Sequence, residues 1–135
     1  MNMTPALEDY LEAVLIVTQN QGLVRVKDLA SFLRVKAPSV IQALNHLKAK
    51  GLVHQEPYGS INLTEAGRSH AREIYRRHKT LKKFFQTIVG LDEVVAEEEA
   101  CKIEHYLNKD TIHRILKFTE ANTAQGHQCR PLRAL

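Results

Sequence analysis

The sequence contains no tryptophan, few aromatic residues and only two cysteines, and each shortage narrows the class of protein. Cys101 and Cys129 lack the spacing of a disulfide framework, so we expect free thiols in a reducing cytoplasm. No apolar run approaches the roughly 20 residues that a membrane helix needs, and the first residues do not begin a secretory signal. The chain also lacks a glycine-rich phosphate loop and a Gly-x-Ser-x-Gly motif. We therefore expect a cytoplasmic protein that makes no contact with a membrane.

The charge is unevenly distributed along the 135 residues. A hydrophobic share of 44% with 25% charged residues is typical of a folded chain with a core of its own. The net charge is +4, and residues 1–90 hold 13 Lys and Arg against 7 Asp and Glu, whereas residues 91–135 hold 6 against 8. The first two thirds of the chain are therefore where a polyanion would bind.

Three helices are predicted in the N-terminal part. The first spans Pro5–Gln19, and the second spans Val26–Leu33. The third spans Ser39–Ala49, because Pro38 favours a first helical turn and Gly51 favours a stop. Two short helices joined by a tight turn are typical of a helix-turn-helix.

A short hairpin is predicted directly after the third helix. Leu52–Glu56 and Ile61–Leu63 have the composition of strands, and Pro57–Ser60 between them has the composition of a turn. A hairpin in this position is the wing of a winged helix-turn-helix. We therefore predict a DNA-binding domain over residues 1–64.

The rest of the chain is predicted to be helical, which makes the fold class mainly α. Helices are expected over Thr64–Gly90, Glu93–Leu107 and Thr111–Ala121. The first of them carries a seam at coiled-coil spacing, formed by Ala71, Ile74, His78, Leu81, Phe85 and Ile88. We predict that residues 65–135 form a second, helical domain.

One stripe of the helix expected over Glu93–Leu107 collects metal-ligating side chains. Glu97, Cys101, Glu104 and His105 lie four, three and one residues apart. Cysteine prefers burial and is unusual on a charged face. The alternative is a solvated acidic helix with an incidental cysteine and histidine.

Two other helices carry candidate ligands. Asp9 and Glu12 lie one turn apart on the first helix, and His78 interrupts an apolar seam. Carboxylate pairs are often merely solvated, and a lone core histidine is often only hydrogen-bonded. Mixed oxygen, nitrogen and sulfur donors favour Fe(II), Mn(II), Co(II) or Zn(II) over Ca(II) or Mg(II). Periodicity alone does not bring the three helices together.

Two strings carry a family resemblance. Glu8-Asp9-Tyr10-Leu11-Glu12, followed by Glu99-Ala100-Cys101-Lys102-Ile103-Glu104-His105, resembles the diphtheria toxin repressor and manganese transport regulator family. The resemblance extends to Val26–Ala30, Pro38–Val40 and Leu63–Gly67. It implies a homodimeric winged-helix repressor, in which a metal joins the first helix to the dimerisation helices and so controls binding to a palindromic DNA operator.

The resemblance also implies a hybrid metal site. Asp9, Glu12 and His78 match ligands of the manganese regulators, and both branches share Glu104 and His105. Cys101 stands where the iron-sensing branch has cysteine and the manganese branch has glutamate. An ancillary site of the iron branch is absent by this comparison, because Lys82 and Glu97 replace two of its ligands. Glu97 is kept as a further candidate ligand. The set favours Fe(II), with Mn(II) close behind, and Zn(II) or Co(II) are expected to bind in vitro.

The candidate DNA contacts are exposed polar and basic side chains in or near the predicted helix-turn-helix and wing. Gln42 and Asn45 could read base edges, whereas the lysines and arginine would hold phosphates. The full set is Arg25, Lys27, Lys36, Pro38, Ser39, Gln42, Asn45, His46, Lys48 and Tyr58.

Three other functions stay open from the sequence. The first is a winged-helix regulator that senses a small molecule or thiol oxidation, with Cys101 as the sensor. The second is a metalloenzyme, since these donors around a cation could activate water, although no second base stands out. The third is a metal-storage or interaction module without DNA contact.

Overall fold

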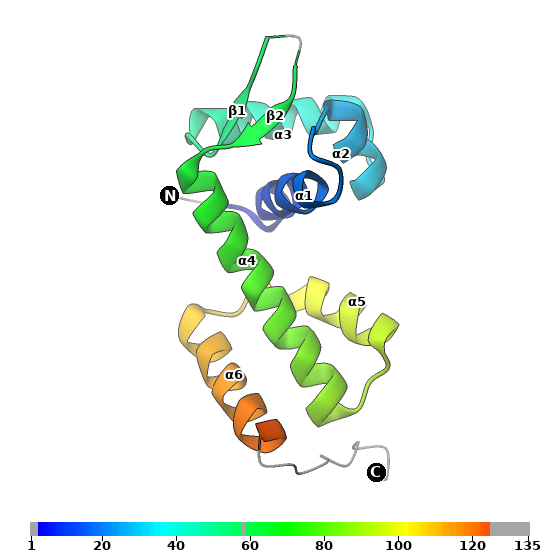
Figure 1. The fold of residues 1–135 in the computed structure, drawn as a ribbon, viewed down its shortest axis with the longest axis vertical. Helices are drawn as coiled ribbons and strands as arrows, with labels where there is room; N and C mark the ends of the chain where they lie inside the picture. Colours follow the sequence, from blue (N-terminus) through cyan, green and yellow to red (C-terminus); the bar gives the residue numbers. More distant parts are fainter. Residues whose placement is uncertain (1–2, 58, 125–135) are drawn as a thin grey trace. The chain divides into compact units, whose positions relative to one another are not determined.

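The computed structural model describes residues 3–57 and 59–124 (Figure 1). The chain divides into two compact units, Met1–Glu73 and Ile74–Leu135, and helix α4 (Glu65–Phe84) contributes residues to both. Two residues singled out from the sequence, Tyr58 and Cys129, lie outside the described residues.

The first unit begins with three helices. Helix α1 (Pro5–Gln21) starts where Thr4 Oγ1 accepts a hydrogen bond from Leu7 N, and it ends at Gly22, whose φ of 87° favours glycine. The helix therefore extends two residues beyond the predicted Gln19.

Helices α2 (Val26–Leu33) and α3 (Ala37–Ala49) form the predicted helix-turn-helix. The turn includes Arg34 in the left-handed region, with φ of 57°. Helix α3 starts two residues earlier than predicted, because Pro38 lies inside the first turn, where its missing N–H has no intrahelical partner to lose.

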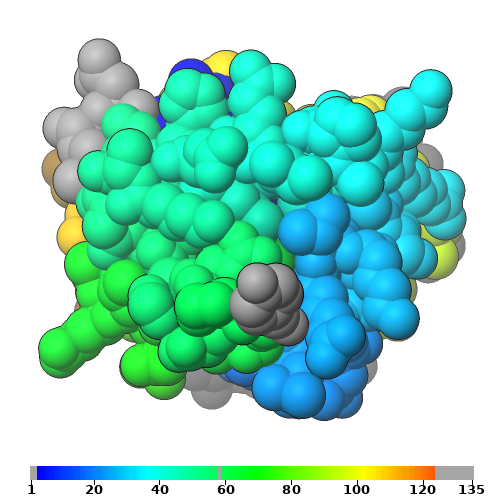
Figure 2. All heavy atoms as spheres, turned by 90° about the horizontal axis from the view of Figure 1, so that it is seen from above, coloured from blue at the N-terminus to red at the C-terminus, as the bar shows by residue number. Residues whose placement is uncertain are grey.

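Strands β1 (Val53–Gln55) and β2 (Ile61–Leu63) form the predicted hairpin. They pair antiparallel, with Val53 opposite Leu63. The hairpin is joined to the helices by a hydrogen bond from Ile61 N to the carbonyl oxygen of Val24 (2.7 Å). Figure 2 shows α3, the hairpin and α2 on one exposed face of this unit.

The core of the first unit is aliphatic. Helices α1, α2 and α3 contact one another, and β1 and β2 pack on α3 and α1 respectively. The side chains that are fully or almost fully buried there include Leu11, Val14, Val24, Leu29, Val40, Leu44, Leu47 and Ile61. This core fixes α3 with its polar face outward.

The second unit is helical. After α4 come the π-helical turn η1 (Phe85–Val89), α5 (Glu93–Ile103) and α6 (Lys109–Ala124). Leu81, Ala100 and Ile112 form its buried core, with Phe85, Ile103, Leu107 and Ile115 packed against them.

Four predicted helix boundaries in this unit differ from the structure, and one of them is the end of α6, at Ala124 instead of Ala121. The helix expected to reach Gly90 is α-helical only to Phe84, because its last turn adopts π geometry. Helix α5 ends at Ile103 rather than at Leu107. The chain then turns, and α6 starts at Lys109 instead of Thr111, since the side chain of Asn108 caps it by accepting from Thr111 N (2.8 Å).

The predicted fold class is confirmed: a winged helix-turn-helix is followed by a helical unit. Within residues 3–57 and 59–124, no helix is both long enough and apolar enough to cross a membrane.

Candidate metal centre and nucleic-acid interface

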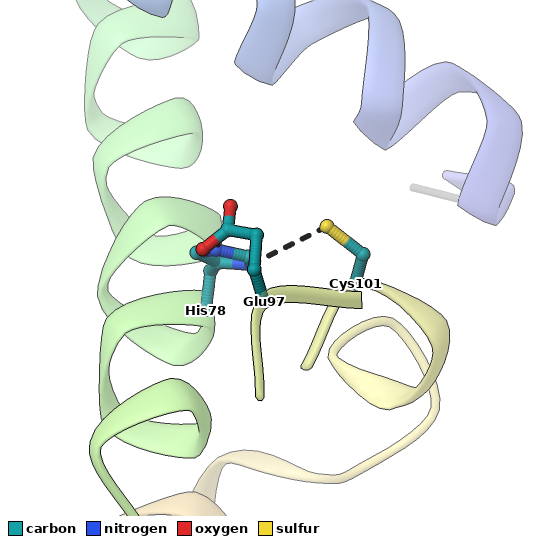
Figure 3. Close-up of side chains that lie close together, drawn as sticks. All are labelled: His78, Glu97 and Cys101. Atoms are coloured by element: carbon teal, nitrogen blue, oxygen red, sulfur yellow. Dashed lines mark hydrogen bonds and ion pairs between the residues drawn. The ribbon is translucent and has the colours of Figure 1, made fainter. Parts of the chain in front are cut away.

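His78 is at the centre of a group of side chains in the second unit that could hold a metal ion. It lies on α4, with 9% of its side chain exposed, and it faces Glu97 and Cys101 on α5 (Figure 3). Donor atoms of these three residues all lie within 4.8 Å of one another. The spacing of four residues between Glu97 and Cys101 on α5 places both on one helix face, as predicted.

The two ring nitrogens of His78 have different partners. Nδ1 lies 2.7 Å from Oε2 of Glu104 and 3.7 Å from Sγ of Cys101. Nε2 lies 2.8 Å from Oε1 of Glu97. The Nδ1 edge of the ring therefore has a thiol and a buried carboxylate beside it, whereas the Nε2 edge has a half-exposed carboxylate.

These contacts control the protonation of His78. Burial would lower its pKa, but hydrogen bonds to Cys101 and Glu104, together with their charges, outweigh burial and raise the pKa to about 11. In the metal-free protein at neutral pH, His78 is therefore an imidazolium that neutralises part of an acidic cluster.

Glu97 is shared between His78 and a lysine. Its Oε2 forms an ion pair with Lys82 Nζ at 3.1 Å, and the same Nζ lies 3.4 Å from Glu93 Oε1. Burial would raise the pKa of Glu97, but the hydrogen bond from Lys82 and the charge of His78 lower it. Glu97 is therefore an ionised carboxylate held between two cations.

Glu104 and His105 lie in the turn after α5 rather than on the helix. The side chain of Glu104 is 1% exposed, and its Oε1 lies 3.3 Å from Nε2 of His105. The backbone carbonyl of Glu104 accepts a hydrogen bond from Arg77 Nη1 (3.0 Å). The early end of α5 thus places Glu104 against His78 of α4 and fixes it there through its own backbone.

The other two candidate ligands stand on α1 of the first unit. Asp9 is exposed and Glu12 is buried. Their neighbour Glu8 pairs with His70 at the start of α4, Oε2 to Nε2 at 3.0 Å. Of the seven predicted ligands, the second unit brings together five: His78, Glu97, Cys101, Glu104 and His105.

Sequence reasoning missed two residues of this cluster. Arg77 was given no role, and Lys82 was noted only as a departure from a family pattern. Lys82 lies four residues after His78 on α4, the spacing of helix neighbours, and this was the signal available in the sequence.

The predicted DNA-contacting residues lie where a polyanion could reach them. All nine that are described are partly or largely exposed, and six of them belong to α3: Pro38, Ser39, Gln42, Asn45, His46 and Lys48. Arg25 precedes α2, Lys27 lies on α2, and Lys36 precedes α3. Figure 2 shows the face that carries α3 and the hairpin.

Two contacts define the surroundings of α3. Ser39, Gln42 and His46 line a groove of about 490 Å³ with Leu7 and Tyr10 of α1. On the other side, the Lys48 ammonium donates to Gln55 Oε1 of β1 at 2.6 Å. That bond connects α3 to the hairpin.

The first unit has a helix-turn-helix on a buried core, a hairpin after its second helix and an exposed polar face. These features define a winged-helix transcriptional regulator. Sequence comparison identifies the family. Residues 2–61 match the iron dependent repressor N-terminal DNA binding domain, and residues 64–130 match the iron dependent repressor metal binding and dimerisation domain. The chain belongs to the iron-dependent repressor family, which confirms the resemblance seen in the sequence.

Individual relatives agree. An HTH-type transcriptional regulator of Methanocaldococcus jannaschii is 40% identical over 119 residues, which cover 87% of this chain and 95% of that protein. The HTH-type transcriptional regulator MntR of Lysinibacillus sphaericus is 32% identical over 117 residues, covering 87% and 84%. The crystal structure of IdeR from T. acidophilum superimposes with a TM-score of 0.75 at 27% identity, and the match covers 87% of this chain but only 55% of that one.

Proposed function

We propose that this protein is a metal-responsive repressor that binds a palindromic operator as a homodimer when loaded with a divalent transition metal. Fe(II) is the favoured metal and Mn(II) follows closely. The observation that carries the proposal is the convergence of His78, Glu97 and Cys101 in the unit that matches the family's metal-binding domain.

The donors fit such an ion. An imidazole nitrogen, a thiol sulfur and carboxylate oxygens suit borderline first-row metals, whereas Ca(II) and Mg(II) prefer oxygen alone. We propose His78, Cys101, Glu104 and His105 as ligands in the second unit, with Glu97 beside them. On the strength of the sequence resemblance, we further propose that Asp9 and Glu12 of α1 complete the centre. When bound, the ion supplies positive charge to a cluster rich in carboxylates.

The proposed control is electrostatic. Without metal, Asp9, Glu12 and Glu104 repel one another, and α1 is held less firmly toward the dimerisation helices. With their charge compensated, these residues fix α1, and with it α3, at the spacing of two half-sites. A typical coupling free energy of about 1–3 kcal/mol would change operator affinity roughly 5- to 150-fold.

Dimerisation has support in the second unit. Val94 and Phe118 are 67% and 52% exposed, and Tyr106 is 74% exposed. Residues 64–130, which include all three, match the family's metal binding and dimerisation domain. We propose that the second unit supplies the homodimer contact and that residues 1–64 supply the DNA contact.

The test is anaerobic fluorescence anisotropy with DNA from the gene's own promoter, using metal-free protein and protein with Fe(II), Mn(II), Zn(II) or Co(II). At least one metal is expected to tighten binding well beyond the level seen on unrelated DNA. Cys101→Ala and Asp9→Ala are each expected to remove that gain. Equal affinity with and without every metal would contradict the proposal.

Two rivals are separated by these variants together with His78→Ala and an assay for turnover. A thiol-oxidation sensor would depend on Cys101 but not on Asp9 or His78. A metalloenzyme would show turnover when loaded with metal, without a metal-dependent change in DNA affinity. The winged helix-turn-helix favours the repressor over the metalloenzyme. The match of residues 64–130 to a metal binding and dimerisation domain favours it over the thiol sensor.

A further inference from the structure

In the proposed metal centre, some residues bind the metal, and others only orient the residues that bind it. A neutral imidazole has one N–H donor and one free lone pair, so the partner of one nitrogen decides what the other can do. Nε2 of His78 lies 2.8 Å from Glu97, a carboxylate that only accepts. In the metal-free protein Nδ1 also faces an acceptor, Glu104 Oε2 at 2.7 Å, so both nitrogens are protonated. When a metal replaces one proton, donation from Nε2 to Glu97 leaves the lone pair on Nδ1, which faces Cys101 and Glu104.

Lys82 keeps Glu97 in that place. Both oxygens of Glu97 are engaged, Oε1 with His78 and Oε2 with the Lys82 ammonium at 3.1 Å. Lys82 is held in turn by Glu93 at 3.4 Å. A divalent cation on the Nε2 side of His78 would therefore have to displace an ammonium already bound to the same carboxylate.

We propose that Glu97 is a positioning residue and not a metal ligand: it accepts the Nε2 proton of His78, Lys82 clamps it, and the metal binds on the Nδ1 side. The inference rests on the proposed metal centre. Carboxylates that accept from a ligating histidine fix its tautomer and raise its basicity, and their loss typically lowers metal affinity about 10- to 100-fold. Each subunit then has one ion, not two, at His78.

The first experiment titrates the full chain with Co(II), anaerobically and without DNA. Wild type, Glu97→Gln and the control Glu98→Gln are compared; Glu98 is the next residue on α5, is exposed, and makes no contact with His78. Glu97→Gln is expected to lower the affinity roughly 10- to 100-fold. At saturation, its ligand-field bands and its sulfur-to-cobalt charge-transfer band should stay at the wild-type positions.

Two results would overturn the proposal. Ligand-field bands that shift in saturated Glu97→Gln would mean that a ligand was lost. An affinity equal to that of Glu98→Gln would mean that Glu97 acts only through its charge at a distance.

A double-mutant cycle tests the role of Lys82. Removing an ammonium also removes its direct repulsion of the metal, but this effect is common to both backgrounds and cancels when Lys82→Met is compared in wild type and in Glu97→Gln. Because the pair is partly exposed, we expect Lys82→Met to be about 2- to 5-fold more harmful in wild type. Lys82→Arg should restore the wild-type value, and Lys83→Met should show no coupling to Glu97. A coupling of zero would overturn the clamp.

The outcomes separate this inference from the proposed function. Suppose that Co(II) binds with a sulfur-to-cobalt band and that Glu97→Gln behaves as expected, but that metal does not change DNA affinity. The repressor mechanism then fails, and the role of Glu97 stands. If wild type does not bind Co(II), or binds it without a sulfur band, the inference is overturned whatever the DNA result.

Discussion

Glu104 and His78 form a buried pair, with Oε2 of the carboxylate 2.7 Å from Nδ1 of the imidazole and only 1% and 9% of the two side chains exposed. Removing Glu104 leaves the Nδ1 side of the buried imidazole without its carboxylate, and breaking a buried pair in this way typically costs about 3–5 kcal/mol. We expect Glu104→Ala to lower the free energy of unfolding of the metal-free protein by about 3 kcal/mol, measured by denaturant titration with a chelator present.

Two variants control for that measurement. Glu97→Ala removes a carboxylate on the other side of His78 that is half exposed, and it should cost under about 1 kcal/mol. Replacing both members by leucine should cost less than Glu104→Ala alone, since no charge is then left unpaired. Equal losses for Glu104→Ala and Glu97→Ala would contradict the assignment of Glu104 as the buried partner.

Metal binding should release a proton from His78. Its pKa is raised from 6.5 to about 11, so the metal-free protein at neutral pH carries the proton that a ligating nitrogen must lose. Apparent affinity should therefore rise with pH by up to about tenfold per unit for this one proton. Calorimetry in two buffers of different ionisation enthalpy counts the protons released; His78→Gln should release one fewer, and an unchanged count would contradict the prediction.

The same shift affects stability with the opposite sign. A pKa raised in the folded state contributes stability that is fully present below about pH 6.5 and is lost as the pH rises toward about 11. Both effects have one origin: the proton that stabilises the metal-free protein at His78 is the proton that competes with the metal for its nitrogen, and alkaline conditions remove it.

Gly67 makes a close contact that no larger residue can replace. A Cβ built there would lie 1.8 Å from the carbonyl oxygen of Leu52, which accepts a hydrogen bond from Thr64 N. We expect Gly67→Ala to push α4 away from the wing and to cost about 3 kcal/mol or more. Gly51→Ala, where nothing lies within 4 Å, should cost only about 1 kcal/mol for its φ of 71°. Thermal denaturation compares the two, and similar losses would contradict the argument.

The helix-turn-helix was predictable because its signals are local. Pro38 and the apolar spacing around it place α3 within two residues, and the limits of α2 are those predicted. The end of α5 was not predictable in this way. Its pattern continues to Leu107, but the helix stops at Ile103, where Glu104 becomes buried against His78 and its carbonyl bonds to Arg77. A tertiary contact overrides local propensity there.

The cluster around His78 was only partly readable. The stripe of Glu97 and Cys101 follows from helical spacing, but periodicity does not say which nitrogen of His78 faces which residue. The pairing of Lys82 with Glu97 depends on the approach of α4 and α5, which comes from packing of Leu81 against Ala100. The role of the Lys82 charge between these two helices could therefore not be predicted from the sequence.

Replacing the sulfur should change the preference among metals. Cys101→Glu exchanges a soft donor for a hard oxygen, and hard donors suit Mn(II) better than Fe(II), Co(II) or Zn(II). We expect the ratio of Mn(II) to Co(II) affinity to rise by roughly tenfold, which is about 1.4 kcal/mol. Competition titrations measure the ratio. Cys101→Ala is the control, since it should weaken both metals without favouring Mn(II), and an unchanged ratio in Cys101→Glu would argue that Cys101 is not a ligand.

On DNA, a base-reading residue and a phosphate-holding residue should behave differently. Gln42 is exposed on α3, and Lys36 stands exposed at its N-terminus, where a phosphate is favoured. Gln42→Ala should cost about 1–3 kcal/mol on the operator and little on unrelated DNA, because amide side chains read base edges. Lys36→Ala should weaken binding to both DNAs alike and reduce the slope of log affinity against log salt by about one.

Lys48 is a poorer probe, since its ammonium already bonds to Gln55 and its loss would also loosen the wing. Anisotropy titrations over a range of salt concentrations on both DNAs separate the two roles, and a Gln42→Ala variant that loses equal affinity for both DNAs would remove it from the readout of sequence.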